Sequence, residues 1–544
     1  MKKILSAALA VIILLGTLVS CKPFNPFPTT TTTTGTSVTT AAPVGEGTLL
    51  PNGERRAFEE CGFYELLGYI DTVYKQNYIY EYDSEKVYAN TKKVYDEGFF
   101  DELRGEDLIH AVTNYFIYEI GDLYGAYFTE KGYSDFVADM EGEHVGIGIS
   151  VVYLENFEYH AVKGDKNSET VSGGIMIVHI ESGSKSADKL KVGDVIIRIE
   201  GENVSDLGFD GATEKIRGDV GTMANFSILR GAEIIEGDND PYPYAFDSSS
   251  AEEIDVSAER VDFIAGTVDH EMLDGNIGYI RILQFSNNTE YEFLEAFVKL
   301  IDGGAKKFIF DVRGNPGGSV DSVLPILSII LDYDKNSEKK AIFTVADKDG
   351  KEDPEYLAWS EEMMDYYDID KDDKATEELS YANIADEYAY FASELKAEAE
   401  LLEGEEKAEA LELAAKYERY ANFDYQLPAG AEVVVLANGN SASGAEHFTK
   451  ILSDFGISYI IGEKTFGKGS MQTMMPAKGY TVKYGIVKVT ANTYSSPYSD
   501  NFNGIGIYPD KEITLETVEG YISPFLIPRE KDNQLSAAIE YLTK

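Results

Sequence analysis

The chain has 544 residues and carries 95 Asp plus Glu against 47 Lys plus Arg, a formal net charge of −48. A chain of this length has room for two to four domains, each with its own hydrophobic core. The acidic excess excludes nucleic acid as a partner, because binding it requires basic side chains that neutralise phosphates.

The N-terminus has the features of an export signal. Lys2 and Lys3 precede an apolar run, residues 4–19, which is short for a membrane span and typical of a secretory signal. The run ends in Leu-Val-Ser before Cys21, which resembles a bacterial lipobox, although an ordinary signal with an unrelated cysteine would look similar. We therefore expect a lipoprotein signal peptide over residues 1–20, lipidation of Cys21, and an exported protein held on the extracytoplasmic side of the cell membrane by lipid alone. Cys61, the second cysteine, would then have no disulfide partner.

Two regions follow the signal. Residues 21–54 are rich in Pro and Thr, a composition that cannot bury a core and predicts an extended tether. Over residues 55–143, apolar side chains recur at helical spacing, which predicts a helical N-terminal domain. Its first such set is Tyr64, Leu67, Ile70 and Val73.

A serine and a lysine stand out near the C-terminal end. The run 432–437 predicts a buried strand, and the apolar spacing after Asn438-Gly-Asn predicts a helix that ends before Gly456. Ser443 would lie at the N-terminus of this helix, where the N–H groups and the helix dipole favour an oxyanion. A second strand, 459–461, leads to a Gly-rich loop with Lys468. A helix-capping serine and a solvated loop lysine have the same spacing, so spacing alone leaves both interpretations open.

The motifs themselves resemble a known family. Ser-Ala-Ser-Gly-Ala-Glu at 441–446 and Gly-Glu-Lys-Thr-Phe-Gly-Lys-Gly-Ser-Met-Gln at 462–472 closely resemble the active-site signature of the carboxy-terminal processing (tail-specific) peptidases. The resemblance implies that Ser443 is the nucleophile, Lys468 its base and Gln472 the side chain that orients the lysine. It also implies an α/β core of the ClpP/crotonase type. One departure is Gly-Ala at 444–445, where the family more often has Ala-Ser.

An oxyanion hole is implied by a second motif. Strands are predicted at 276–282 and 307–312 with a helix at 291–301 between them, the pattern of a βαβ unit. The second strand ends in Arg-Gly-Asn-Pro-Gly-Gly at 313–318, which by itself could be a tight turn. The resemblance implies that the N–H groups of Gly318 and Gly444 form the oxyanion hole, each contributing on the order of 3 kcal/mol.

Residues 144–232 look like a PDZ domain. Val-Gly-Ile-Gly-Ile at 145–149 and the short strand-like runs up to Arg230 predict a small β-rich module with one helix near its end. Such a module binds a chain terminus at a sheet edge and holds the carboxylate with loop N–H groups, here those of Gly146, Ile147 and Gly148. Just upstream, residues 120–129 are similar to the family pattern Leu-Gly-Asp-Pro-Tyr-Ser.

Two acidic segments interrupt the family pattern. We expect the stretch 236–257 to be irregular, and the peptidase core to span 260–544 with an acidic helical insert at about 334–428. Within the insert, Gly404 would separate two amphipathic helices. The run 368–372 has the carboxylates of a calcium loop, but the Gly and Glu that such a loop requires are replaced by Asp373 and Leu379, so a solvated helical hairpin is expected.

The six histidines suggest a different mechanism, a Ser-His-Asp hydrolase built on Ser443. His447 lies four residues along the same helix, so we expect its side chain to point a turn away from the serine hydroxyl. The other histidines show no metal-ligand spacing, and we expect neither metal nor cofactor. They are His110, His144, His160, His179 and His270.

These patterns predict a multidomain α/β protein with an inserted PDZ domain and a helical N-terminal region. We expect an exported serine endopeptidase that cleaves proteins at or near their C-terminal tails, with proteins or peptides as partners. The alternative is a PDZ scaffold or regulatory binding protein on the same fold, which would have no need of Ser443, Lys468 and Gln472 together. The sequence does not set the oligomeric state.

Overall fold

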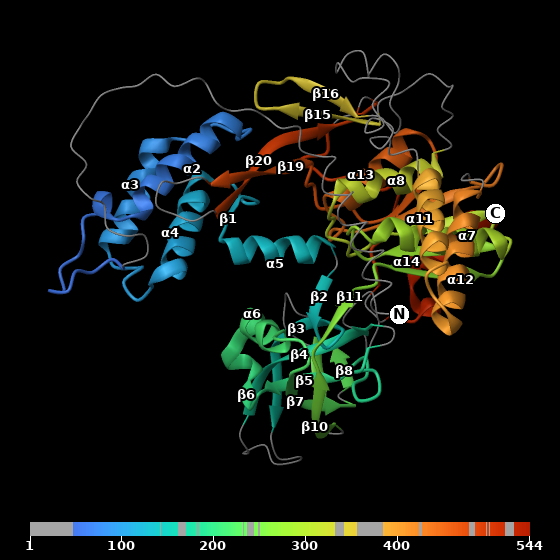
Figure 1. The fold of residues 1–544 in the computed structure, drawn as a ribbon, viewed down its shortest axis with the longest axis horizontal. Coiled ribbons are helices and arrows are strands. Elements are labelled where there is room, and N and C mark those ends of the chain that lie inside the picture. The colour runs from blue at the N-terminus through green and yellow to red at the C-terminus, as the bar shows by residue number, and fades with distance from the viewer. Residues whose placement is uncertain are drawn as a thin grey trace. The chain divides into compact units, whose positions relative to one another are not determined.

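The computed structural model describes residues 47–141, 143–160, 170–181, 184–231, 233–236, 244–247, 251–331, 342–355, 384–423, 427–477, 485–496, 498–499, 501–516 and 527–544. Its chain forms two compact units, each built from separate stretches of sequence. Figure 1 colours the elements from blue at the N-terminus to red at the C-terminus. The signal peptide, Cys21 and the calcium-like loop lie outside the described residues.

The first unit comprises residues 1–133, 324–427 and 470–501. Its helices near the N-terminus are η1 (Phe58–Glu60), α2 (Phe63–Asn77), α3 (Ser84–Asp96) and α4 (Gly105–Ile120). Asp83 caps α3 through its side chain, and α4 ends at left-handed Gly121. The buried faces of α2 and α4 carry the periodic apolar residues and form one core with β20.

A largely antiparallel sheet completes the core of this unit. Its strands are β1 (Ala126–Phe128), β15 (Phe343–Asp347), β16 (Glu352–Glu355), β19 (Ser470–Ala477) and β20 (Gly485–Ser495). The order is β1-β20-β15-β16, and β19 also pairs with β20, with a register shift between Met471 and Gln472. The acidic insert contributes the predicted hairpin of α11 (Ile384–Ala399) and α12 (Gly404–Ala421), whose aromatic side chains pack against each other.

The second unit comprises residues 134–323, 428–469 and 502–544. Its β-rich module has a six-stranded sheet of order β10-β7-β5-β4-β3, with β6 paired to β5. The elements are α5 (Glu130–Glu141), β2 (Glu143–Gly146), β3 (Ile149–His160), β4 (Thr170–Ile180), β5 (Val195–Ile199), β6 (Glu202–Asn203), α6 (Val204–Ile216), β7 (Met223–Arg230), β8 (Glu233–Glu236), β9 (Tyr244–Asp247), β10 (Glu252–Glu259) and β11 (Val261–Ile264). Helix α6 covers the sheet with Val204, Ala212 and Ile216.

The predicted irregular stretch 236–257 is wrong in part. Residues 244–247 form β9, and β10 pairs with β7 along its whole length. The acidic composition hid an alternation in which Val256 and Ala258 face the core while Ser257 between them is half-buried. The β-rich module therefore uses a strand beyond residue 232, where its predicted end lay.

A mostly parallel sheet of order β12-β13-β14-β17-β18-β21 forms the rest of the second unit. Its elements are β12 (Val268–Leu273), β13 (Ile277–Ile282), α7 (Thr289–Asp302), β14 (Lys307–Asp311), β17 (Val433–Ala437), α13 (Gly444–Asp454), β18 (Ser458–Gly462), β21 (Lys511–Glu512), η3 (Arg529–Lys531) and α14 (Asn533–Thr543). Helix α8 (Val320–Ile330) begins in this unit, and from Leu324 on it belongs to the first. β13, α7 and β14 make the predicted βαβ unit, with β13 and β14 parallel.

The order of these strands brings two loops together. β14 and β17 are parallel neighbours, so the loops that follow them, 312–319 and 438–443, leave the same edge of the sheet. β17 is buried along its whole length and β14 is buried from Phe308 to Asp311, which suits a parallel sheet covered on both faces. Among the described residues, none of the helices is long and apolar enough to cross a membrane.

Candidate active site

Ser443 has an unusual backbone conformation at the start of α13. Its φ is 52° and its ψ is −117°, a region that residues with a side chain seldom occupy. Such a conformation costs on the order of 1–3 kcal/mol and persists where neighbouring contacts enforce it. The structure therefore confirms the predicted position at the helix N-terminus and adds local strain that the sequence did not indicate.

Contacts between the two loops enforce this conformation. The Ala442 N–H donates to the Asn315 carbonyl at 2.9 Å, and the Ser441 hydroxyl donates to the Val312 carbonyl at 2.7 Å. The Asn438 side chain accepts the Gly314 N–H at 3.0 Å. These bonds fix the serine loop against the loop after β14.

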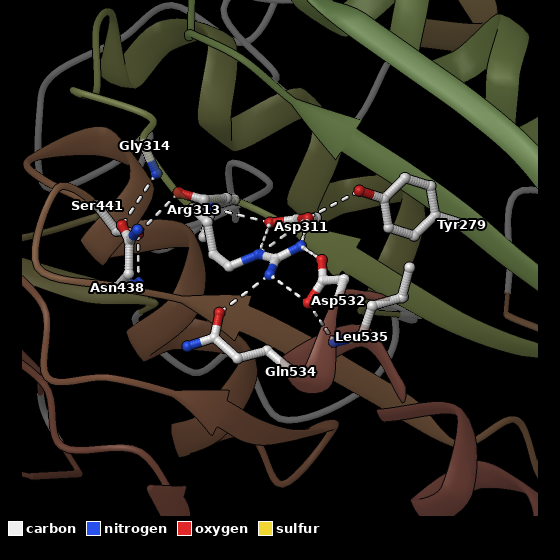
Figure 2. Close-up of polar contacts among 10 residues, drawn as sticks. Tyr279, Asp311, Arg313, Gly314, Asn438, Ser441, Asp532, Gln534 and Leu535 are labelled. Atoms are coloured by element: carbon white, nitrogen blue, oxygen red, sulfur yellow. Dashed lines mark hydrogen bonds and ion pairs between the residues drawn. The ribbon is translucent and has the colours of Figure 1, made fainter. Parts of the chain in front are cut away.

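A buried ion network anchors Arg313, which lies in the loop after β14 (Figure 2). The Arg313 guanidinium contacts Asp311 at 2.6 Å and Asp532 at 2.8 Å, and it donates to Gln534 at 2.9 Å. Tyr279 donates its hydroxyl to Asp311 at 2.7 Å. Burial would raise the pKa of Asp311, but the charge and hydrogen bonds of Arg313 outweigh it and hold the pKa at about 2. The network thus stays charged at neutral pH.

Glycines allow the two loops to approach closely. A Cβ on Gly317, whose φ is 101°, would lie 2.6 Å from the Ser443 Cβ, and one on Gly318 would lie 1.9 Å from the Phe285 carbonyl oxygen. The Phe285 N–H donates to the Gly317 carbonyl, and the Phe285 carbonyl accepts the Ser319 N–H. The Gly318 N–H, which lies between these two groups in the chain, takes no part in this pair of hydrogen bonds. Gly444 is the first residue of α13, where an N–H has no acceptor within the helix. Two backbone donors therefore flank Ser443 within one unit.

Glu446 joins the serine loop to the lysine loop. Its side chain is fully buried and accepts the N–H groups of Ser443 at 3.0 Å and Lys468 at 2.8 Å. It also accepts the Thr465 hydroxyl at 2.5 Å and the Gly467 N–H at 2.7 Å. Such charge-assisted bonds are about twice as strong as neutral ones, so this one side chain fixes the spacing of both loops.

Lys468 and His447 lie near the same helix end. The His447 ring is buried, and its Nδ1 donates to the Ser443 carbonyl at 2.9 Å. Burial, with a smaller contribution from the charge of Lys468, lowers the pKa of His447 to about 3. The histidine therefore binds the backbone carbonyl of Ser443, a contact that its spacing had not indicated, and it is neutral at physiological pH.

Gln472 lies in the other unit, on β19. Its side-chain nitrogen donates to the hydroxyl oxygens of Thr490 at 3.3 Å and Ser470 at 3.5 Å. The sequence did not indicate the contact with Thr490, because this threonine belongs to a different strand, β20.

The predicted peptide-binding loop lies between β2 and β3. The Ile147 carbonyl accepts the Ser184 hydroxyl at 2.8 Å, and the Gly148 carbonyl accepts the Glu181 N–H at 3.0 Å. Gly148 has a φ of 69°, and a Cβ there would lie 2.7 Å from the Ser184 hydroxyl oxygen. Gly146 pairs with Val261 in β11. The carbonyls of Ile147 and Gly148 are thus occupied by the segment that follows β4.

Sequence reasoning missed the residues that hold the loops in place. Glu446 was noted only as part of a motif, while Thr465, Arg313 and Asp532 were given no role. The available signal was Asp311 at the end of a strand whose three central residues are apolar, two residues before Arg313. No cluster of His, Cys, Asp and Glu with metal-binding geometry occurs among the described residues.

The chain is similar in sequence to known peptidases. The family model "Peptidase family S41" matches residues 276–513. A CtpA-like serine protease of Staphylococcus aureus strain N315 is 24% identical over 442 residues, 81% of this chain and 66% of that protein. One of Staphylococcus saprophyticus is 22% identical over 457 residues, 83% of this chain and 70% of that protein.

The chain thus spans just under two thirds of the length of the S. aureus relative. Among solved structures, the photosystem II D1 C-terminal processing protease aligns with a TM-score of 0.43 at 16% identity, covering 82% of this chain and 92% of that one.

Proposed function

We propose that the protein is an exported endopeptidase that cleaves proteins at or near their C-terminal tails, on the premise that residues 276–513 match the model of peptidase family S41. The observation that carries the proposal is the Glu446 side chain, which binds the backbone of both Ser443 and Lys468. A scaffold that only tethers proteins would have no use for this arrangement.

In the proposed mechanism, the Ser443 hydroxyl oxygen attacks the scissile carbonyl while neutral Lys468 takes its proton. The ammonium group of Lys468 then gives this proton to the leaving amino group. In deacylation the neutral amine takes a proton from the attacking water and returns it to the Ser443 oxygen as the acyl bond breaks. Gln472 orients the lysine. His447 does not serve as the base, because its Nδ1 faces a backbone carbonyl and its pKa is far below neutrality.

The Gly318 and Gly444 N–H groups are the proposed oxyanion hole. They flank Ser443, and the loops that carry them are fixed by Asn315, Asn438 and the Arg313 network. Donors held in place before reaction cost no reorganisation when the oxyanion forms. The strained Ser443 backbone fits the same role, because strain of this kind is concentrated at functional sites.

The finer architecture is also part of the proposal. We assign a ClpP/crotonase-type core and a PDZ domain that begins near residue 144 and whose loop Gly146, Ile147 and Gly148 binds substrate C-termini. Support comes from the order of strands around α6 and from the left-handed glycine in that loop. A lipid on Cys21 would hold the protein at the outer face of the cell membrane through the tether 21–54.

Substitutions at the serine and the lysine test the mechanism. Ser443→Ala and Lys468→Ala should each lower kcat/KM for a peptide substrate by on the order of 10³ or more, with far-UV circular dichroism unchanged. Lys468→Arg should be equally inactive, since arginine cannot act as a neutral base. Ser453→Ala and Lys464→Ala, which lie on α13 and in the lysine loop, serve as matched controls. Turnover like the wild type in Ser443→Ala would exclude the mechanism.

Peptide pairs that differ only at the C-terminus test tail recognition. Amidation removes the charge and one acceptor oxygen, so kcat/KM should fall by about one to two orders of magnitude relative to the free acid. Equal cleavage of both forms would show that the β-rich module does not bind C-termini, while leaving the peptidase assignment intact.

A further inference from the structure

A buried carboxylate in the first unit accepts four hydrogen bonds. Asp122 is 5% exposed and directly follows the left-handed Gly121 at the end of α4. Its oxygens accept the Thr490 N–H at 2.9 Å, the Thr490 hydroxyl at 2.6 Å and the Tyr124 N–H at 3.2 Å. The fourth donor is the Tyr74 hydroxyl at 3.1 Å. Four donors suit a carboxylate, whose oxygens only accept.

The tyrosine and a glycine hold Asp122 in place. Burial and the nearby carboxylate raise the pKa of Tyr74, so its hydroxyl keeps its proton and donates. A Cβ on Gly125 would lie 2.2 Å from the Tyr74 hydroxyl oxygen and 2.6 Å from Asp122, so only glycine fits there. The turn after α4 is thus built around this carboxylate.

The hydrogen bond from Thr490 to Asp122 determines whether the Thr490 hydroxyl donates to Gln472 or accepts from it. A threonine hydroxyl has one hydrogen, and at 2.6 Å it is directed at Asp122. Toward Gln472, 3.3 Å away, only the lone pairs of this oxygen remain. Gln472 must therefore turn its NH₂ group to Thr490, and its carbonyl oxygen is left to accept a hydrogen bond elsewhere.

We propose that Asp122 and Thr490 are positioning residues that set the orientation of the Gln472 carboxamide, with its NH₂ group toward Thr490 and its carbonyl oxygen turned away from it. This inference rests on the proposed function, in which Gln472 orients Lys468. Without Asp122, the Thr490 hydroxyl could turn its hydrogen toward Gln472, and the carboxamide would flip. All three residues lie in the same unit, on the turn after α4 and on the paired strands β19 and β20.

A double-mutant cycle at Thr490 and Gln472 tests the proposal in the full-length protein. Thr490→Val keeps the shape and the backbone bond but removes the hydroxyl, and it should lower kcat about tenfold with KM within about twofold. Thr490→Ser should restore kcat to within about twofold. Thr493→Val, a threonine on the same strand without a role in this contact, should leave kcat unchanged.

The decisive measurement is Thr490→Val in the Gln472→Ala background. If Thr490 acts through Gln472, the double variant should match Gln472→Ala alone, because no carboxamide remains to be oriented. A merely structural role predicts effects that multiply. Multiplying effects, or wild-type kcat in Thr490→Val beside an impaired Gln472→Ala, would overturn the inference.

Asp122→Asn provides a second cycle should Thr490→Val fail to fold, as judged by thermal melting. An asparagine offers one acceptor oxygen to four donors, so the Thr490 hydroxyl should reorient and kcat should fall in the same Gln472-dependent way. If Gln472→Ala itself has wild-type kcat, both the inference and the proposed role of Gln472 fail, whereas an inactive Ser443→Ala would still support the peptidase assignment.

Discussion

Replacing Arg313 by Met should destabilise the second unit strongly and in a pH-dependent way. The guanidinium is almost fully buried and contacts Asp311 and Asp532, so its removal leaves two carboxylates in the interior without their cation. Breaking a buried ion pair from one side costs about 3–5 kcal/mol. We expect a loss of unfolding free energy of this size at pH 7.

The pKa of Asp311 gives the pH dependence. In the wild type it is lowered from 3.8 to about 2, which corresponds to about 2.5 kcal/mol of stability. A lowered carboxyl pKa stabilises fully above pH 3.8, and this contribution is lost as the pH falls from 3.8 toward 2. In Arg313→Met the largest opposing charge is gone and, among charges, only the smaller effect of Arg281 remains, so burial should raise the pKa of Asp311 and the variant should recover as the carboxyl takes up a proton. The difference between the two proteins should therefore shrink from pH 7 to pH 4.

Urea unfolding followed by far-UV circular dichroism at pH 7, 5 and 4 measures this difference. Arg198→Met is the matched control, because its partner Glu253 is partly exposed and such pairs contribute about 0–1 kcal/mol. A loss in Arg313→Met below about 1 kcal/mol, or one of equal size at all three pH values, would refute the reasoning.

Three further predictions concern other parts of the molecule. Gly317→Ala should abolish peptidase activity, because the added Cβ would collide with Ser443. Gly53 has a similar φ of 83° with open space around it, so Gly53→Ala should keep full activity. An active Gly317→Ala in a peptide assay would contradict the described approach of the loops. The pKa of His447 is lowered to about 3, so the stability that the neutral ring contributes is complete above about pH 6.5 and is lost as the pH falls toward 3. His447→Gln should therefore flatten the decline of the melting temperature between pH 6.5 and 4. An unchanged dependence of the melting temperature on pH would show that the histidine is not buried in its neutral form. Cys21→Ser should abolish metabolic labelling with a fatty acid, and labelling at the wild-type level would show that the lipid lies elsewhere.

The sequence predicted those parts of the fold that depend on local patterns. The strand before Ser443, the helix after it and the βαβ unit of β13, α7 and β14 follow from apolar periodicity and turn residues. The strand β10 was missed, because its acidic residues outweighed an alternation that only two buried side chains carry. Most of the acidic residues of β10 are exposed, whereas the position of the strand in the sheet depends on its buried residues, Val256 and Ala258.

The supporting side chains of the site could not be predicted, because their partners are distant in sequence. Arg313 meets Asp532 across 219 positions, and Thr490 meets Asp122 across 368. No local spacing rule connects such pairs. The nucleophile and base candidates were accessible because each sits in a short motif, whereas the residues that hold them in place are visible only once the chain is folded.

The position of Asp532 has a consequence for the order in which the protein can become competent. Asp532 caps α14 by accepting the Leu535 N–H. It also binds Arg313, which belongs to the same loop as Gly318. During synthesis a chain folds from its N-terminal side first, so the loops at 313–318 and 438–443 emerge before their anchor exists. Until residues 532–535 are translated and docked, Arg313 lacks half of its carboxylate partners. The nascent polypeptide should therefore remain inert as a peptidase until α14 has been made and has docked.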